Sequence, residues 1–470
     1  MCLLAAASTP GDTIVLKNGR RIAALSVTQT GNKVTYETSS GTLSLPSAIV
    51  DHVEKGGAPA VDGPSAASAM SLKPPDTEAA APLSPNRNEI ELRVVRDGEV
   101  DRNYVAQLEI EARSGQGLAN QNAAMGHYAA SQFEMLHGDM DLALADARSA
   151  LIYAPEQPVL LMDVAYLYLR RSEYKQSLDY VERARRVAPE DPEVSKLAGW
   201  AYFGLNKLDE AVKEWKHALS LRPDAEVEAA LKKAERDKQE EEQYKENESS
   251  HFTLRYSGAS EPALARDVLH ALEAHYGAIE SELNYSPPES IGVILYTQQA
   301  FADITQAPNW VGALNDGRIR VPVQGLSGVT PELSRVLRHE LTHSFVQQKT
   351  IGQAPTWIQE GLAQWMEGKR SETNAAALLA IYRSDPALGS SHLGGNWVKL
   401  SSTEAAAAYA WALANVEYIV QTDGMGDMER ILDRLATGEA PEAAVQAVLR
   451  SGYAELTSNT VEYLRKSYGN

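Results

Sequence analysis

Cysteine is almost absent from this sequence, because its 470 residues include only Cys2. A single thiol cannot form an intramolecular disulfide, and its isolation excludes every zinc site that is built from a cysteine cluster. A metal ion in this chain would therefore have to be held by histidine and carboxylate side chains.

Basic residues are in the minority as well. The chain has 44 Lys and Arg against 63 Asp and Glu, a formal net charge of -19. This charge repels phosphate backbones unless a basic patch is segregated, and no run of Lys and Arg supplies one. The sequence thus argues against nucleic acid as a partner. The remaining composition is that of a globular protein, and its length suggests about three domains.

Long apolar runs are also missing, since the chain has no uncharged apolar stretch of about 18 residues, and we expect no transmembrane segment. Residues 1–10 contain a short apolar run that ends in the small residues Ala5-Ala6-Ala7 and lacks a basic region. This pattern fits either the tail of an export signal or a disordered N-terminus. The first interpretation predicts an exported protein of the periplasm or cell envelope, and the second a cytoplasmic one.

Residues 11–55 alternate apolar and polar side chains between turn signals, which predicts a small β module, a sheet or barrel of about four strands. The turn signals are Asn18-Gly19, Thr30-Gly31 and Ser40-Gly41. Residues 56–88 are rich in Ala, Pro, Ser and Gly and have too few large apolar side chains to form a core. They predict a disordered linker that tethers the β module.

A 34-residue periodicity marks residues 89–236 as a helical repeat region. Proline recurs at Pro155, Pro189 and Pro223, where it would close each repeat because it cannot continue a helix. Small residues that would let paired helices touch recur in the same register. They are Ala143, Ser177 and Ala211, followed by Ala150, Ala184 and Ala218. The alternative is an ordinary helical bundle with coincidental spacing.

Over residues 122–236 this pattern resembles the tetratricopeptide (TPR) family, although the turn position is Gly138 in one repeat and Ser172 and Asn206 in the others. The resemblance implies an all-α solenoid that binds a protein partner on a concave face. We expect the first helices, with Tyr168 and Tyr202 or their neighbours, to form that face.

A mixed α/β domain is expected over residues 251–470, after a charged segment, residues 237–250, that is either a linker or a helix prolonging the repeats. Alternation over residues 251–256 predicts a strand, and helical periodicity covers residues 261–283. Residues 291–296 are a candidate for a short buried strand.

The sequence His339-Glu340-Leu341-Thr342-His343 lies in a stretch, residues 331–348, that is predicted to be helical. Residues i and i+4 share a face of a helix, so the two imidazoles could bind one zinc ion, and Glu340 could reach the reacting water. The structural alternative is a helix with two surface histidines.

A third ligand is needed for a catalytic zinc site, and Glu360 is the candidate. Gly352 and Pro355 end the first helix, and a capping-box pattern at Thr356 opens a second helix that runs through Glu367. Glu360 would project from its first turns toward the histidines. The metzincin arrangement is excluded because Val346 and Lys349 occupy its Gly and His positions.

The two histidines followed by Trp357-Ile-Gln-Glu-Gly-Leu-Ala363 resemble the gluzincin metallopeptidases, and most nearly the peptidase-MA-like family. This resemblance implies an α+β thermolysin-like domain with a helical C-terminal part. It implies His339, His343 and Glu360 as zinc ligands and Glu340 as general base. Thermolysin-like members have an Asp four residues after the ligand Glu, which orients a ligand His; here Gln364 would accept that hydrogen bond more weakly.

Three further features are candidates for substrate contact. Residues 317–323 alternate with Pro322 near the end, which predicts an edge strand that could pair with an extended substrate or simply complete the sheet. Tyr409, in a stretch similar to related domains, could donate a hydrogen bond to the oxyanion, and His392 is a second candidate donor. Each tyrosine of this kind can also be a core residue.

The sequence therefore predicts three folded parts, namely the β module, an all-α TPR solenoid and a gluzincin-like domain. The function predicted first is zinc-dependent peptide hydrolysis, with Zn²⁺ as cofactor and the repeats recruiting a protein substrate or partner. The competing function is a TPR scaffold with an inactive peptidase-like domain, against which the retained Glu340 argues.

Overall fold

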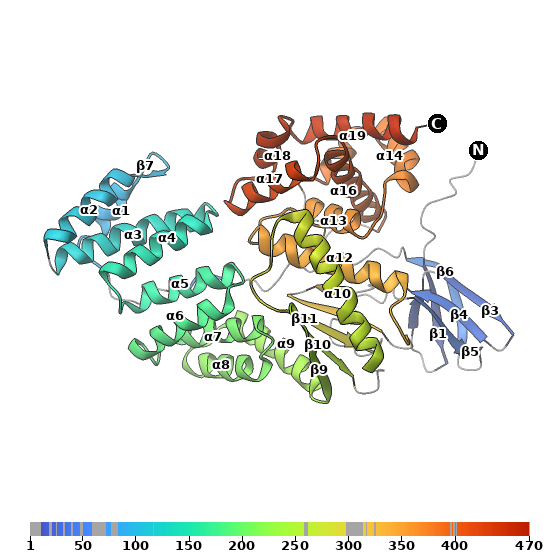
Figure 1. Cartoon of the computed structure of the whole chain (residues 1–470), viewed down its shortest axis with the longest axis horizontal. Helices are drawn as coiled ribbons and strands as arrows, with labels where there is room; N and C mark the ends of the chain where they lie inside the picture. The colour runs from blue at the N-terminus through green and yellow to red at the C-terminus, as the bar shows by residue number, and fades with distance from the viewer. Residues whose placement is uncertain are drawn as a thin grey trace. The chain divides into compact units, whose positions relative to one another are not determined.

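A computed structural model gives the fold of the chain (Figure 1). The residues that it describes are 11–17, 21–24, 26–31, 33–38, 41–47, 50–58, 72–76, 83–115, 117–257, 262–297, 314–315, 317–323, 326–394, 397, 400 and 402–469. The chain divides into two units, one of residues 1–69, 240–433 and 440–470 and one of residues 70–239 and 434–439. Within the described residues, none of the helices is long and apolar enough to cross a membrane. The predicted signal segment, residues 1–10, lies outside them.

The N-terminal β module consists of two antiparallel sheets of three strands each, in the orders β2-β1-β6 and β3-β4-β5. The strands are β1 (Gly11–Leu16), β2 (Arg21–Ala24), β3 (Ser26–Thr30), β4 (Lys33–Thr38), β5 (Gly41–Pro46) and β6 (Val50–Ala58). Ile14, Val27, Val34 and Tyr36 form its core. The prediction of about four strands was too low. Strand β6 also continues past the predicted boundary at residue 55, because Ala58 pairs with Gly11 and this pairing provides hydrogen-bond partners for the backbone of the glycine-rich end of β6.

The predicted linker, residues 56–88, is partly wrong. Besides the end of β6, its described residues include Leu83 and Ser84, which are buried, and the Ser84 hydroxyl donates to Asn122 Oδ1 at 2.7 Å. Helix α1 (Arg87–Val94) then begins inside the predicted linker. Composition missed these contacts because they are made with residues far along the chain.

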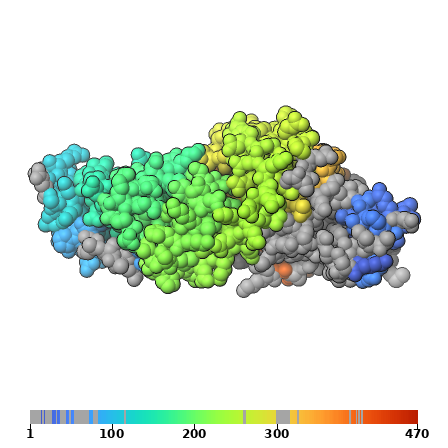
Figure 2. All heavy atoms as spheres, turned by 90° about the horizontal axis from the view of Figure 1, so that it is seen from below, coloured from blue at the N-terminus to red at the C-terminus, as the bar shows by residue number. Residues whose placement is uncertain are grey.

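The second unit is helical, and its helices follow one another in sequence order (Figures 1 and 2). After α1 come the short strands β7 (Val95–Arg96) and β8 (Glu99–Val100) and then eight helices. These are α2 (Arg102–Ser114), α3 (Leu118–Leu136), α4 (Met140–Tyr153), α5 (Pro158–Arg170), α6 (Tyr174–Val187), α7 (Pro192–Gly204), α8 (Leu208–Leu221) and α9 (Ala225–Glu241). The pairs α3–α4, α5–α6 and α7–α8 pack together.

The helix boundaries repeat at the 34-residue interval that the sequence predicts: α3, α5 and α7 end at Leu136, Arg170 and Gly204. Each repeating proline lies two residues beyond the end of α4, α6 or α8. The turn positions Gly138, Ser172 and Asn206 all have positive φ, at 86°, 60° and 62°. The turn therefore requires a residue in the left-handed backbone conformation, which glycine adopts with the least strain.

The expected role of Tyr168 on a concave face is wrong, because this side chain faces the second helix of its own pair. Its ring centroid lies 5.5 Å from that of Tyr180 in α6, and the residue is buried. The neighbour Tyr166 instead donates its hydroxyl to the carbonyl oxygen of Leu72 at 3.4 Å. Tyr202 is half-buried, and burial raises the pKa of its phenol.

Asp163 in α5 makes the stability of this unit depend on pH. It is fully enclosed, and burial raises its pKa from 3.8 to about 7 although Gln132 donates to it at 2.8 Å. The unfolded chain releases this proton near pH 4 and the folded chain holds it to about pH 7, so stability falls as the pH rises between these values. The free energy of unfolding should therefore be about 2–3 kcal/mol lower at pH 8 than at pH 5.

We therefore expect Asp163→Asn to remove this loss of stability above pH 5. Urea unfolding of the full chain and of the variant at pH 5 and pH 8 measures the effect, with the exposed Asp179→Asn in α6 as control. An equal pH dependence in wild type and Asp163→Asn would contradict the assignment.

The C-terminal domain is built on one five-stranded sheet of order β12-β13-β11-β10-β9. The strands are β9 (Tyr244–Glu248), β10 (Phe252–Ser257), β11 (Ile291–Tyr296), β12 (Leu314–Asn315) and β13 (Arg318–Pro322). The three inner strands are parallel and the two outer ones antiparallel to their neighbours. The charged segment, residues 237–250, is not a linker, because it completes α9 and forms β9, in which Tyr244 and Asn247 are half-buried.

The helices of this domain include the two predicted around the histidine motif. They are α10 (Pro262–Leu283), α12 (Pro331–Lys349), α13 (Thr356–Met366), α14 (Glu372–Ser384), α15 (Ala387–Ser391), α16 (Ser402–Thr422), α17 (Met425–Ala436), α18 (Pro441–Leu449) and α19 (Tyr453–Tyr468). Helix α10 packs on β10 and on α12, and α13 packs between α12 and α16. Residues of α14, α16 and α19 form a core cluster that includes Trp411 and Leu464.

Strand β13 is not the edge strand that Pro322 indicated, because β12 pairs with it at Ile319 and Arg320. Its arginines are buried instead of facing a substrate: Arg318 donates to the Glu241 carboxylate at 2.6 Å, and Arg320 donates to the Tyr296 hydroxyl at 2.7 Å. Proline is tolerated because the described residues of β12 reach only the middle of β13.

Candidate metal centre

Helix α12 carries the two histidines, and its start is fixed by residues of its own sequence. The Thr330 side chain accepts a hydrogen bond from the Leu333 amide at 3.1 Å, and Pro331 occupies the first helical position, where no amide hydrogen is needed. The apolar side chains of the helix, among them Leu337, Leu341 and Phe345, are fully buried. The histidines share the buried part of this helix and are not surface residues.

Helix α13 supplies Glu360, and its start differs from the predicted capping box. Pro355 is the N-cap, without a side-chain hydrogen bond, and Thr356 is already helical. The helix is buried on all sides and lies against α16, which it can approach only because residue 361 is glycine. A Cβ at Gly361 would lie 2.5 Å from the carbonyl oxygen of Ala412. The close contact of the two helices thus fixes the position of the adjoining Glu360.

The structure brings His339, His343 and Glu360 together. Glu360 Oε2 lies 3.6 Å from His339 Nε2 and 3.7 Å from His343 Nε2, and the two Nε2 atoms are 3.1 Å apart. Three ligands of a tetrahedral zinc ion with bonds of about 2.0–2.1 Å would be about 3.3 Å from one another. The three atoms therefore form a triangle of the size that one such ion requires.

The burial of this triangle also fits a metal ion. His339 and His343 are each 3% exposed and Glu360 is fully buried. A buried carboxylate is costly unless a positive charge compensates it, and two imidazole nitrogens with one carboxylate oxygen are a frequent ligand set of hydrolytic metal sites. Within the described part of the chain no other three His, Cys, Asp or Glu side chains converge in this way. These residues could hold a metal ion.

Glu367, and not Gln364, is the residue that contacts His339 Nδ1. His339 Nδ1 lies 3.3 Å from Glu367 Oε1, which leaves Nε2 of the same ring for the metal ion. Gln364 instead donates its amide hydrogens to the backbone oxygens of Glu360 and Tyr409, at 3.2 and 3.0 Å. The signal in the sequence was the seven-residue spacing of Glu360 and Glu367, which places both on one face of a helix.

Glu367→Ala should weaken zinc binding by about 10- to 100-fold without abolishing it, because the imidazole loses the acceptor that fixes its orientation. Competition with a chromophoric chelator measures the affinity. Glu367→Gln should recover part of it, since an amide oxygen can still accept from Nδ1–H. The exposed Glu372→Ala in α14 serves as control, and an unchanged affinity in Glu367→Ala would show that Glu367 does not orient the ligand.

Asn315 connects the outermost strand to the helix that carries the histidines. Its side-chain amide donates to the backbone oxygen of Glu340 at 2.8 Å and to Ser344 Oγ at 2.7 Å, while its Oδ1 accepts from the Gly317 amide at 3.1 Å. Sequence analysis did not single out this residue, because the contact joins segments 25 and 29 residues apart. Strand β12 is thereby held beside the turn of α12 that contains Glu340.

The other predicted site residues have mixed outcomes. Glu340 is buried in α12 directly after His339, in the same turn as the ligands. Tyr409 is a buried residue of α16 whose ring packs edge-on against Trp397, with centroids 5.1 Å apart. His392 ends α15, and burial lowers the pKa of its imidazole. Within the described part of the chain, His392 is not among the side chains that converge at the metal triangle.

Comparison with known proteins agrees with the site. Residues 282–465 match the family model of the Peptidase MA superfamily, and this segment contains the three ligand candidates, Glu340 and Glu367. No curated protein matches the chain. The C-terminal part of the chain, residues 282–465, thus has the features of a Peptidase MA superfamily domain, a family that is generally metal-dependent.

Proposed function

We propose that this chain is a zinc-dependent peptidase that hydrolyses peptide bonds at the site formed by His339, His343 and Glu360. The observation that carries the proposal is the triangle of ligand atoms, with sides of 3.1 to 3.7 Å, inside a segment that matches the Peptidase MA superfamily. Its donor set of two imidazoles and one carboxylate is that of zinc peptidases.

When bound, the zinc ion would supply Lewis-acid activation of water and of the substrate carbonyl. The chain itself supplies the proton transfers. The Glu340 carboxylate accepts a proton from the attacking water and delivers it to the nitrogen of the leaving amine, so it needs to be ionised at the start of each cycle. Glu367 holds the proton on His339 Nδ1, which keeps Nε2 available as a ligand.

Tyr409 and strand β12 are proposed substrate contacts. The Tyr409 hydroxyl would donate to the oxyanion of the tetrahedral intermediate, as the resemblance of its helix to related domains implies. The strand beside the metal helix is β12, so β12, and not β13, is the one against which an extended substrate could lie. In the same proposal, the 34-residue repeats recruit a protein substrate or partner.

Chelation tests the proposed activity directly. The purified full chain should cleave an unfolded protein when loaded with zinc, lose that activity on removal of the metal, and regain it when one equivalent of zinc is returned. Cleavage that survives complete removal of metal would point to a contaminating protease or to a different mechanism. Absence of cleavage by the zinc-loaded chain would favour a scaffold with an inactive domain.

A further inference from the structure

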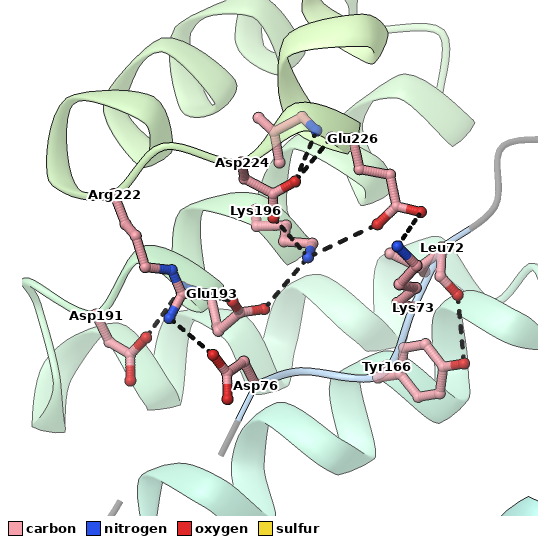
Figure 3. Close-up of polar contacts among 11 residues, drawn as sticks. Leu72, Lys73, Asp76, Tyr166, Asp191, Glu193, Lys196, Arg222, Asp224 and Glu226 are labelled. Carbon is pink, nitrogen blue, oxygen red and sulfur yellow. Dashed lines mark hydrogen bonds and ion pairs between the residues drawn. The ribbon is translucent and has the colours of Figure 1, made fainter. Parts of the chain in front are cut away.

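Residues 72–76 lie on the helical unit as a bound peptide would. The close-up in Figure 3 shows this segment passing in front of the helices that carry Tyr166, Glu193 and Lys196. It belongs to the same unit as these helices, although its contacts reach residues 94 and 146 positions away in the sequence. The segment reads Leu-Lys-Pro-Pro-Asp.

Contacts are made at both ends of this segment, and Pro75 between them is buried. The backbone oxygen of Leu72 accepts from the Tyr166 hydroxyl at 3.4 Å, and Lys73 Nζ lies 3.8 Å from the Glu226 carboxylate (Figure 3). At the other end, Arg222 donates to Asp76 Oδ2 at 3.2 Å. The surface therefore contacts a backbone carbonyl, a cation, a proline ring and an anion in that order.

The two prolines prepare the segment for this role. Proline fixes φ, and a residue before proline favours extended backbone, so Pro74 and Pro75 bias residues 73–75 toward polyproline II. At about 3.1 Å per residue, that conformation places the Cα atoms of Lys73 and Asp76 about 9 Å apart. A peptide of this kind loses little conformational entropy when it binds.

The receiving surface has charges that are held in place by the helical unit itself. Arg222 is hydrogen-bonded to the buried Glu193 as well as to Asp76, and Lys196, which is 8% exposed, lies 2.9 Å from Asp224. Burial raises the pKa of the Glu193 carboxyl, while Lys196 and Arg222 oppose this shift. The guanidinium of Arg222 thus remains positioned for a carboxylate whether or not Asp76 is the one that it binds.

The charged side chains of the segment are held loosely by comparison. The side chains of Lys73 and Asp76 are 72% and 52% exposed, and ion pairs at such exposure contribute little to stability. A strap that existed only to stabilise the helices would be expected to bury its charged ends or replace them with apolar side chains. Exposed ends on a preorganised surface are what an exchangeable ligand requires.

We infer that residues 72–76 are an internal ligand of a peptide-binding surface on α5, α7, the end of α8 and the start of α9. The partner of that surface is an extended protein segment with a cation and a carboxylate three residues apart and prolines between them. Such a partner displaces residues 72–76. This peptide chemistry specifies the partner that the repeats recruit in the proposed function. The experiment measures binding alone, so its outcome is independent of whether the chain hydrolyses peptides.

Competition between the internal segment and a free peptide should change the apparent affinity for the peptide by a measurable factor. A tethered ligand acts at an effective concentration on the order of 1 mM. A free peptide with an intrinsic Kd of about 0.1 mM would then bind the wild-type chain about tenfold more weakly than a chain whose segment cannot bind. Disabling the internal segment should therefore tighten binding of the same sequence supplied separately.

The test uses a fluorescein-labelled peptide with the sequence of residues 70–78 and fluorescence anisotropy with the full chain. The disabled chain carries Lys73→Ala, Pro75→Ala and Asp76→Ala together, and circular dichroism checks that its helices are intact. We expect binding at least about tenfold tighter than to wild type. A control peptide with the lysine and aspartate exchanged should bind at least about tenfold more weakly than the native one.

A protein-side change then assigns the carboxylate contact. When Arg222→Gln is added to the disabled chain, it should weaken binding of the native peptide. It should have little further effect on binding of a peptide in which the aspartate is replaced by alanine. The inference is overturned if the native peptide binds wild-type and disabled chains equally, if the exchanged peptide binds as well as the native one, or if neither chain binds peptide at millimolar concentration. In the last case the segment is a structural strap.

Discussion

Glu340→Gln is expected to retain zinc and to reduce hydrolysis by about 10²- to 10⁴-fold. The amide has the shape of the carboxylate but cannot accept a proton from water at neutral pH, so the step that generates the nucleophile loses its base. The ligands are unaffected, because the metal triangle is formed by His339, His343 and Glu360 and not by this side chain. Single-turnover cleavage of an unfolded protein, with metal content measured on the same sample, gives both quantities.

Glu332→Gln is the matched control, since it makes the same chemical change in the same helix. Glu332 lies in the first turn of α12, is half-buried and forms an ion pair with Arg335 at 3.5 Å. Its activity should be that of wild type. If Glu340→Gln cleaved as fast as Glu332→Gln, Glu340 would not be the general base, although the zinc site itself could still be present.

His343→Ala is expected to remove both metal and activity. The substitution leaves two of the three ligands of a buried site, and zinc affinity should fall far enough for the metal to be lost on dialysis. Hydrolysis should drop at least as far as in Glu340→Gln, because both the activation of water and the orientation of substrate depend on the metal. Elemental analysis and the cleavage assay report the two losses separately.

The control for this change is His270→Ala in α10, an exposed histidine outside the metal triangle. It should keep full zinc content and full activity. A His343→Ala protein that still held one zinc per chain would show that the metal is bound somewhere other than the triangle. Thermal unfolding of both variants distinguishes loss of the ligand from loss of the fold.

Local signals predicted the parts of this protein that depend on neighbours in the sequence. The 34-residue spacing of prolines anticipated where α4, α6 and α8 end, because proline acts on its own turn of helix. The spacing of His339 and His343 anticipated a shared helix face for the same reason. Glu360 could be found as well, since the two helices that bring it to the histidines are consecutive in the chain.

The features that sequence analysis missed or misjudged depend on contacts between distant segments. Asn315 donates to the backbone of Glu340, 25 residues away, so local alternation could not predict this hydrogen bond. Strand β12 pairs with β13, so local alternation could not predict which strand lies at the edge of the sheet either. Glu367 lies about one turn beyond the position, four residues after Glu360, at which thermolysin-like members have the residue that orients the histidine. Residues 72–76 have the composition of a linker, and only their contacts on the helical unit reveal a bound segment.

Zinc titration of the metal-free full chain tests the central claim most directly. The distances among His339 Nε2, His343 Nε2 and Glu360 Oε2 fit one ion, held at one site. We expect a stoichiometry of one zinc per chain, measured against a competing chelator and checked by elemental analysis for zinc and iron, and its loss in His343→Ala. A wild-type chain that binds no zinc after loading, or binds it equally well without His343, would contradict the account.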